Sequence, residues 1–407
     1  MIKKTEGGVC AAAGFSAYGM RCGIRKNKTK KDLALILSDR DAAAAAVYTT
    51  NLVKGAPLTV TKRHLDGNGG TARAAICNSG IANTCCEGGV LAADTECRAL
   101  AGALGIPEDR VIVASTGVIG QPLDPGVIVR AIPELVSGLS PDGGPLAAEA
   151  IMTTDTRRKE TAYEFSVGDT VCRIGGCAKG SGMIHPNMAT MLVFITTDAA
   201  VSPAMLERAL SDDIDGSFNM ISIDGDTSTN DMVSVMANGA AGNALIDAEG
   251  PGFDALREAL SRVTNDLCRM IAADGEGASR LLVCEVSGAA TLKDARLAAR
   301  SVISSNLLKA AMFGADANWG RVLCAAGYSG ASFDPSECSV FFSGEAGRIE
   351  VCRGGCGVDF SEEEAKKILS GSEITIEVGL GNGKYSARAL GCDLTYDYVK
   401  INGDYRT

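Results

Sequence analysis

A glycine-rich loop that runs straight into an apolar segment is the feature that most limits how this chain can fold. Residues 179–190 read KGSGMIHPNMAT, and their glycines and proline disfavour regular secondary structure. Residues 191–197 read MLVFITT, a short apolar run with β-branched and aromatic members, which predicts a buried strand. The junction therefore places Thr190 at the start of a buried strand.

Thr190 has two interpretations on local sequence. The simpler one is an ordinary first residue of a strand, because a threonine alcohol within a chain has no strong reason to react. If the chain were cleaved between Ala189 and Thr190, however, the new α-amine would act as general base for the hydroxyl of the same residue. The local sequence leaves both interpretations open.

Length and composition indicate a globular protein with room for two or three compact units. The chain has 407 residues, of which 46% are hydrophobic and 22% charged, and its formal net charge is −10. The negative charge argues against nucleic acid as a partner. No apolar run approaches the length of a membrane span, and Glu6 and paired glycines interrupt any signal-like N-terminus, so we expect a cytoplasmic protein without membrane contact.

The cysteines do not form a pattern typical of disulfides or structural zinc. Their number, fifteen, is odd, their spacing is irregular, and only two histidines, His64 and His185, accompany them. We therefore expect buried free thiols in a reducing compartment and no metal site.

Strand-like and helical segments alternate along the chain, which indicates a mixed α and β fold (α/β or α+β). The clearest helix is predicted over residues 253–271, where apolar residues recur at spacings of three and four. A second is expected over 91–104, and a third after Ser361, whose sequence SEEE fits a capping box. Residues 33–37 and 281–286 read as strands, and a domain boundary is expected near residue 281.

Nine segments in order resemble the ornithine acetyltransferase family, also called bifunctional glutamate N-acetyltransferase/amino-acid acetyltransferase, of arginine biosynthesis. The loop segment KGSGMIHPNMATM is similar to the family's self-cleavage segment. The other eight are GGVCAAAGFSAYG from Gly7, DLALILSD from Asp32, ASTGVIGQPL from Ala114, IMTTDT from Ile151, FNMISIDGDTSTND from Phe218, DGEGAS from Asp274, NWGR from Asn318 and YVKINGDYRT from Tyr398.

The resemblance implies a self-cleaving sandwich of two sheets covered by helices, like that of N-terminal-nucleophile enzymes, with a smaller C-terminal α/β domain. It implies an α chain of residues 1–189 and a β chain of 190–407, assembled as two α and two β chains. The main domain, 1–280, would be built from both chains, and the smaller domain would span 281–407.

The resemblance also assigns roles to residues. Thr190 would be the nucleophile, and its free amine the base; Thr116 and Gly117 would form the oxyanion hole. The substrate-binding residues would be Thr153, Lys179, Thr190, Glu276, Asn402 and Thr407. Complementary charge agrees with this set, since Lys179 could pair with an α-carboxylate and Glu276 with the ammonium of ornithine. Without the resemblance, an exposed loop charge is an equally open interpretation of each.

The implied reaction moves acetyl from N2-acetylornithine to glutamate through acetyl-Thr190, without a cofactor. Acetyl-CoA remains open as an additional donor, and an amidase or aminopeptidase on the same scaffold is the alternative chemistry. A non-enzymatic amino-acid-binding module would require an inert Thr190. His185 is not expected to be the base, because an N-terminal amine makes it unnecessary. Asp224, Asp226 and Asp231 do not fit the calcium-loop spacing and are expected to form a supporting turn.

Overall fold

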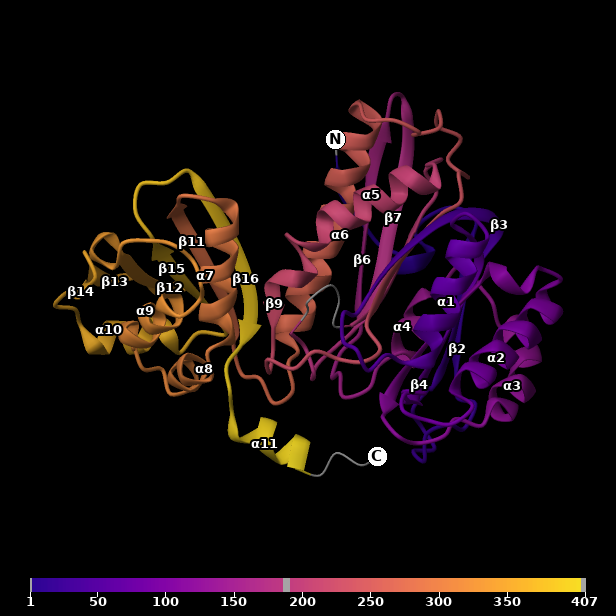
Figure 1. Ribbon diagram of the computed structural model, residues 1–407, viewed down its shortest axis with the longest axis horizontal. Coiled ribbons are helices and arrows are strands. Elements are labelled where there is room, and N and C mark those ends of the chain that lie inside the picture. Colours follow the sequence, from indigo (N-terminus) through magenta and orange to yellow (C-terminus); the bar gives the residue numbers. More distant parts are fainter. Residues whose placement is uncertain (1, 186–190, 404–407) are drawn as a thin grey trace.

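The computed structural model describes residues 2–185 and 191–403 and contains two mixed β-sheets with helices around them (Figure 1). In these ranges the first sheet has nine strands, in the order β1-β6-β7-β8-β10-β3-β4-β5, with β2 paired to β3. Its strands are β1 (Lys3–Thr5), β2 (Phe15–Met20), β3 (Leu33–Tyr48), β4 (Thr71–Ile81), β5 (Val111–Val118), β6 (Lys159–Val167), β7 (Thr170–Lys179), β8 (Leu192–Thr197) and β10 (Met232–Ala237).

The long strand β3 divides the first sheet into two layers. Its first half pairs with β2 and β4, and its second half pairs with β10. Between the halves, the three residues 39–41 are exposed, and the register with β4 shifts. One strand is therefore shared by a β2-β3-β4-β5 layer and a β3-β10-β8-β7-β6-β1 layer.

Side-chain alternation shows that these two layers pack face to face. In β8, Leu192 and Phe194 belong to the cluster between the layers, whereas Val193 and Ile195 belong to the cluster under helices. Because successive side chains of a strand point to opposite faces, each layer buries both faces. The predicted sandwich of two sheets is confirmed.

Helices cover the outer faces of both layers. The helices are α1 (Ala56–Gly67), α2 (Gly89–Leu104), α3 (Pro125–Ser137), α4 (Gly144–Ala150), α5 (Pro203–Ile214) and α6 (Pro251–Ala273). Helices α1 to α3 share a buried cluster with the β2-β3-β4-β5 layer, and α5 and α6 share one with the other layer. Helix α4 instead packs into the cluster between the layers. The expected helices over 253–271 and 91–104 are thus confirmed as α6 and α2.

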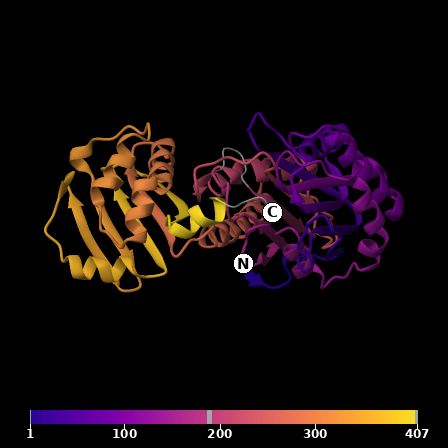
Figure 2. The ribbon, with the colours of Figure 1, turned by 90° about the horizontal axis from the view of Figure 1, so that it is seen from below.

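The second sheet lies at the other end of the molecule (Figure 2). In the described part of the chain its order is β14-β13-β12-β15-β11-β16-β9. These strands are β9 (Ile221–Ser222), β11 (Leu281–Ala289), β12 (Ser339–Gly344), β13 (Gly347–Arg353), β14 (Cys356–Gly357), β15 (Glu373–Gly379) and β16 (Tyr385–Cys392). The helices that follow α6 are α7 (Leu292–Ser304), α8 (Asn306–Phe313), α9 (Trp319–Gly327), α10 (Glu362–Leu369) and α11 (Tyr396–Gly403).

The second sheet is joined to the first by shared packing on α6. In β11, Leu282 and Cys284 face the cluster that includes α7 to α10, whereas Leu281 and Val283 join the cluster of α6. The predicted cap of α10 is confirmed, since Ser361 Oγ accepts a hydrogen bond from Glu364 N at 3.2 Å. Helix α11 leaves the second sheet and extends toward the first (Figure 1).

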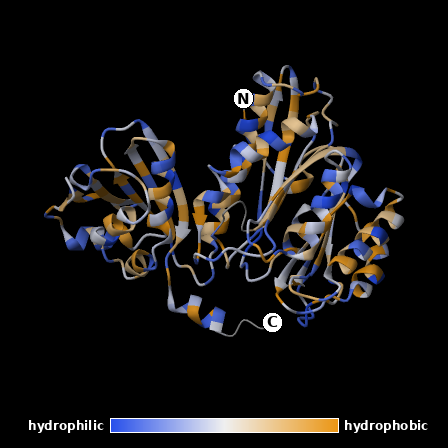
Figure 3. Cartoon of the chain, in the orientation of Figure 1, coloured by the Kyte–Doolittle hydropathy of each residue, from blue (hydrophilic) through white to orange (hydrophobic). Residues whose placement is uncertain are grey.

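The distribution of polarity agrees with a folded globular protein. Apolar residues concentrate on the strands and the inner helix faces, and hydrophilic residues on the outer faces (Figure 3). All fifteen cysteines are free thiols, of which nine are buried, three partly buried and three exposed, so the expected burial holds for nine of them. No described helix is long and apolar enough to cross a lipid bilayer.

Glu96 on α2 is a buried carboxyl group for which no hydrogen-bond partner is found among the described residues. Burial raises its pKa to about 8. The native protein therefore keeps this proton at a pH where the unfolded chain has released it, and stability falls as the pH rises from about 4.5 to about 8.

We expect Glu96→Gln to stabilise the protein increasingly across that pH range, by about 4 kcal/mol at its upper end. The glutamine has the shape of the neutral acid and does not ionise. Denaturant unfolding at several pH values measures the difference, with the exposed Glu134→Gln as control. A difference that stays constant from pH 5 to pH 8 would contradict the assigned pKa.

Candidate active site

A cavity of about 110 Å³ lies where the ends of β5 and β7 meet α11 and several loops. Every described residue to which the resemblance assigns a catalytic or substrate-binding role lines it. These residues are Thr116, Gly117, Thr153, Lys179, Glu276 and Asn402. The roles expected of Ala189, Thr190 and Thr407 concern residues outside the described ranges. Thr154 lines the cavity beside Thr153, so the geometry does not separate that pair.

Thr116 and Gly117 line the cavity at the end of β5. Gly117 has a φ of 134°, a conformation that residues with a Cβ atom rarely adopt. It is paired with Gly80 of β4. Lys179 Nζ lies 3.2 Å from Thr116 Oγ1. An ammonium group can only donate, so Thr116 accepts this bond and its own hydroxyl hydrogen stays available to a bound oxygen.

Lys179 and Glu276 supply opposite charges within the same pocket. Lys179 is 9% exposed and Glu276 is 7% exposed, so the interpretation of both as exposed loop charges is wrong. Glu276 Oε2 accepts a hydrogen bond from Asn402 Nδ2 at 2.7 Å, which attaches α11 to the cavity. A small molecule with a negative and a positive end would find a complementary charge at each of these residues.

A buried ionic network of Lys159, Asp155 and Asp274 lies beside the pocket residues. Lys159 Nζ contacts Asp155 Oδ1 and Asp274 Oδ2, each at 2.6 Å, and the Lys159 and Asp155 side chains are fully buried. Although burial alone would raise it, the charges of Lys159 and Lys179 lower the pKa of Asp155 to about 2. Asp155 therefore stays ionised and pairs with Lys159 throughout the physiological pH range.

The described residues on both sides of 186–190 are held in place. Asp224 accepts hydrogen bonds from the backbone N–H groups of Met183 and Ile184, so the expected supporting role holds for this member of the three aspartates. On the far side, Met232 N donates to Met191 O at 2.8 Å.

His185 contacts the elements of the second sheet rather than the cavity. Its Nδ1 lies 3.0 Å from Ser222 Oγ and 3.5 Å from Ser304 Oγ, and it is absent from the cavity lining. Burial, assisted by the positive charge of Arg300, lowers the pKa of His185 to about 4. The imidazole is therefore neutral near pH 7 and acts as a structural contact.

Asn230 is a pocket residue that sequence reasoning missed. Its Nδ2 donates to the carbonyls of Ala82 and Ser115 at 2.6 and 2.9 Å, while Thr84 and Thr229 donate to its Oδ1. This amide ties the ends of β4 and β5 to the start of β10. An asparagine within DTSTND looks like an ordinary turn residue, so the sequence contained no signal for this role.

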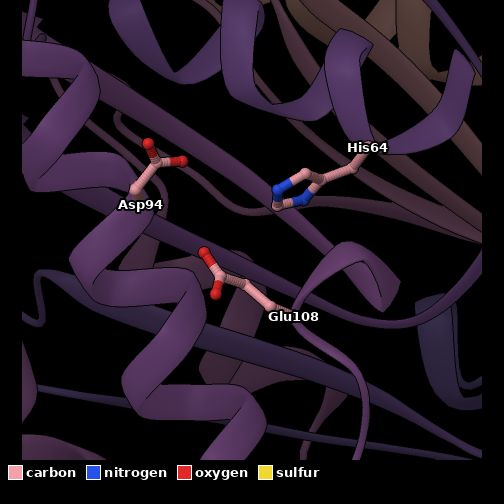
Figure 4. A group of neighbouring side chains, drawn as sticks. All are labelled: His64, Asp94 and Glu108. Atoms are coloured by element: carbon pink, nitrogen blue, oxygen red, sulfur yellow. The ribbon is translucent and has the colours of Figure 1, made fainter. Parts of the chain in front are cut away.

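Elsewhere the described chain contains one group of three side chains with metal-ligating atoms (Figure 4). His64, Asp94 and Glu108 place one such atom each within 4.8 Å of one another. Each carboxylate already contacts an arginine, Arg63 for Asp94 and Arg98 for Glu108. None of the three lines the pocket.

A larger cavity, of about 1100 Å³, lies between α1, α5 and the second half of β3. It contains none of the residues that the sequence singled out for catalysis or binding. The convergence of donors and opposite charges, rather than volume, identifies the functional pocket.

The fold and the pocket together suit an acyl-transfer enzyme whose substrate is a small amino-acid derivative. Comparison with known proteins narrows this class. Residues 16–407 match the model of the ArgJ family, so the chain belongs to that family. Its members include the ornithine acetyltransferases, and the chain is accordingly an acetyltransferase of arginine biosynthesis.

Individual relatives support the assignment over the full length. The arginine biosynthesis bifunctional protein ArgJ of Symbiobacterium thermophilum is 52% identical over 403 residues, covering 98% of this chain and 99% of its own. That of Bacillus subtilis is 46% identical over 407 residues, covering 100% of this chain and 98% of its own. A crystal structure of the Bacillus halodurans ArgJ is 44% identical with a TM-score of 0.50, covering 52% of this chain and 98% of the solved chain.

We expect Gly117→Ala to distort the end of β5, because the added Cβ would overlap the backbone carbonyl of Gly80 at a positive φ. The expected loss is about 2 to 4 kcal/mol of unfolding free energy together with most of the activity. Gly102→Ala in α2 is the control, since it has open space around it and should be neutral or slightly stabilising. Equal unfolding midpoints for Gly117→Ala and the wild type would contradict the described packing.

Proposed function

We propose that the chain is cleaved between Ala189 and Thr190 and then transfers acetyl through an ester on Thr190. The observation that carries this proposal is the pairing around β8. Leu192, two residues after Thr190, is paired with Lys179 of β7 on one side and Met232 of β10 on the other. Since Lys179 lines the cavity, this pairing brings the described start of β8 next to the pocket residues, which supports Thr190 as the nucleophile.

In the proposed first half-reaction, the Thr190 amine takes the proton of its own hydroxyl, and the oxygen attacks the acetyl carbonyl of N2-acetylornithine. The oxyanion that forms accepts hydrogen bonds from Thr116 Oγ1–H and Gly117 N–H. The bond to the ornithine nitrogen breaks as that nitrogen receives the proton. Acetyl-Thr190 and ornithine result.

In the second half-reaction, the α-amine of glutamate attacks the ester and N-acetylglutamate leaves. Lys179 suits the α-carboxylate of either substrate, with Thr153 as a further pocket group. Glu276 suits the ammonium of ornithine, whereas the neighbouring Asn402 amide can donate to the side-chain carboxylate of glutamate. A carboxylate and an amide side by side thus serve two side chains of opposite charge.

Cleavage would give an α chain of 1–189 and a β chain of 190–407, for which we propose an assembly of two α and two β chains in the cytoplasm. The solved Bacillus halodurans chain is about half as long as this one, as a product of cleavage would be. The proposed main domain, 1–280, contains both sides of the cleavage point, and the second domain covers 281–407. Thr407 would complete the substrate pocket.

A second activity is supported by the word bifunctional in the names of both relatives. We propose that acetyl-CoA can also acetylate Thr190, so that glutamate is acetylated without acetylornithine. An amidase is the alternative, in which water replaces glutamate as acceptor.

The direct test of the function incubates the enzyme with N2-acetylornithine alone, followed by acid quenching and peptide mapping. The proposal predicts one acetyl group on the peptide that begins with Thr190. When glutamate is added after N2-acetylornithine and before the quench, this acetyl group should be lost and N-acetylglutamate should form. Steady-state kinetics should show a ping-pong pattern. Acetate as the main product, even with glutamate present, would show the amidase alternative instead.

Thr116→Val tests the hydroxyl donor. Removing one oxyanion donor should lower kcat by about 10² to 10³, because that hydrogen bond is strongest in the transition state. Thr116→Ser keeps the hydroxyl and should retain most of the activity. If valine and serine variants had equal kcat values, the hydroxyl would have no part in the oxyanion site.

A further inference from the structure

The ionic network below the pocket connects its two oppositely charged ends through a single residue. Lys159 is 0% exposed, although it follows two arginines at the start of β6. Its ammonium group lies between Asp155 and Asp274, at 2.6 Å from each. Removing a lysine from water is costly, so such a residue is retained only where its charge is well paired.

Asp155 holds the end of the pocket that contains Thr153 and Lys179. Its Oδ2 accepts from Thr153 N at 2.9 Å, and its Oδ1 accepts from Gly180 N at 2.8 Å. These are the backbone groups of one pocket residue and of the residue directly after another. The position of the Asp155 carboxylate therefore determines where both side chains begin.

Asp274 holds the other end. Its carboxylate accepts from the backbone N–H of Thr156 at 3.1 Å, and its backbone carbonyl accepts from Ser181 Oγ at 2.6 Å. Ser181 O in turn accepts from Glu276 N at 2.8 Å. The acidic end of the pocket is thus two hydrogen bonds away from the residue that binds Lys159.

We propose that Lys159 is a positioning residue that sets the separation between Lys179 and Glu276, and so selects the length of the amino-acid substrate. This inference rests on the proposed function, in which these two residues bind opposite ends of ornithine. Lys159 and Asp155 precede residue 190 and Asp274 follows it, so cleavage turns this network into a buried contact between two chains. The same contact would keep the pocket assembled after the peptide bond is lost.

The charges of the network agree with this role. Two lysines, Lys159 and Lys179, face two aspartates, Asp155 and Asp274, and the exposed Arg157 lies 3.7 Å from Asp274. Without Lys159, two carboxylates would share the space below the pocket and repel one another. The loops they hold would move apart, and a misplacement of about 1 Å costs on the order of 10² in rate.

The test compares kcat and KM for N2-acetylornithine with those for its homologues one methylene shorter and longer, each with glutamate as acceptor. For Lys159→Met we expect the preference for acetylornithine over the better homologue to fall about tenfold, mainly through a raised KM. Asp274→Asn keeps the shape of the network and should shift the preference in the same direction by a smaller factor. If Lys159→Met does not fold, the substrate preference of Asp274→Asn tests the inference by itself.

Lys4→Met is the control, because it breaks an ion pair between β1 and Asp266 of α6 near the surface and should leave the preference unchanged. A purely structural Lys159 would lower the unfolding midpoint without altering the substrate preference. If the wild type is active and both network variants keep its substrate preference and its KM, the inference is overturned while the proposed function stands. A wild type that transfers no acetyl from any of the three donors would overturn the proposed function and this inference with it.

Discussion

The position of β8 is the constraint on which the rest of the structure depends. This strand lies between an antiparallel partner, β7, and a parallel partner, β10, with both of its faces buried. Leu192 and Phe194 pack in one core and Val193 and Ile195 in another, so a shift by one residue would exchange side chains of different shape between the two cores and disrupt the packing of both. The pairing of Leu192 with Lys179 brings the described start of β8 next to the end of β7, where the pocket forms.

The chemistry of the pocket follows from what the sandwich buries around that point. Glycines at 80 and 117 let β4 and β5 approach closely at their ends, which leaves a backbone N–H beside a threonine hydroxyl. Lys179 donates to that hydroxyl and so determines which way it can donate. A pair of donors, a cation and a carboxylate then face one small space, which suits a charged amino-acid derivative undergoing acyl transfer.

Local patterns in the sequence predicted the elements better than their assembly. The stripe of α6 and the cap at Ser361 depend on neighbours within a few residues, and both were found where expected. The strand expected over 33–37 is sixteen residues long. The sequence did not predict its continuation into the second layer, because residues 39–41 look like a loop. Asn230 and Lys159 could not be recognised either, since their partners lie far away in sequence.

The sequence also predicted the residues that line the pocket better than the residues that hold them in place. Motif resemblance indicated Thr116, Lys179 and Glu276, and the structure brings them to one cavity. The resemblance did not indicate Asp155 or Asp274, whose carboxylates hold the backbone around these residues. A lysine after two arginines is normally read as a solvated charge, and only the fold shows that Lys159 is enclosed by two aspartates.

The central claim is that Thr190 becomes a chain terminus, and intact mass with N-terminal sequencing tests it most directly. The purified wild type should contain two fragments, one ending at Ala189 and one beginning with Thr190, whereas Thr190→Ala should stay a single chain. A wild type that remains uncleaved and is active would contradict the account. The base would then have to be a side chain rather than the Thr190 amine.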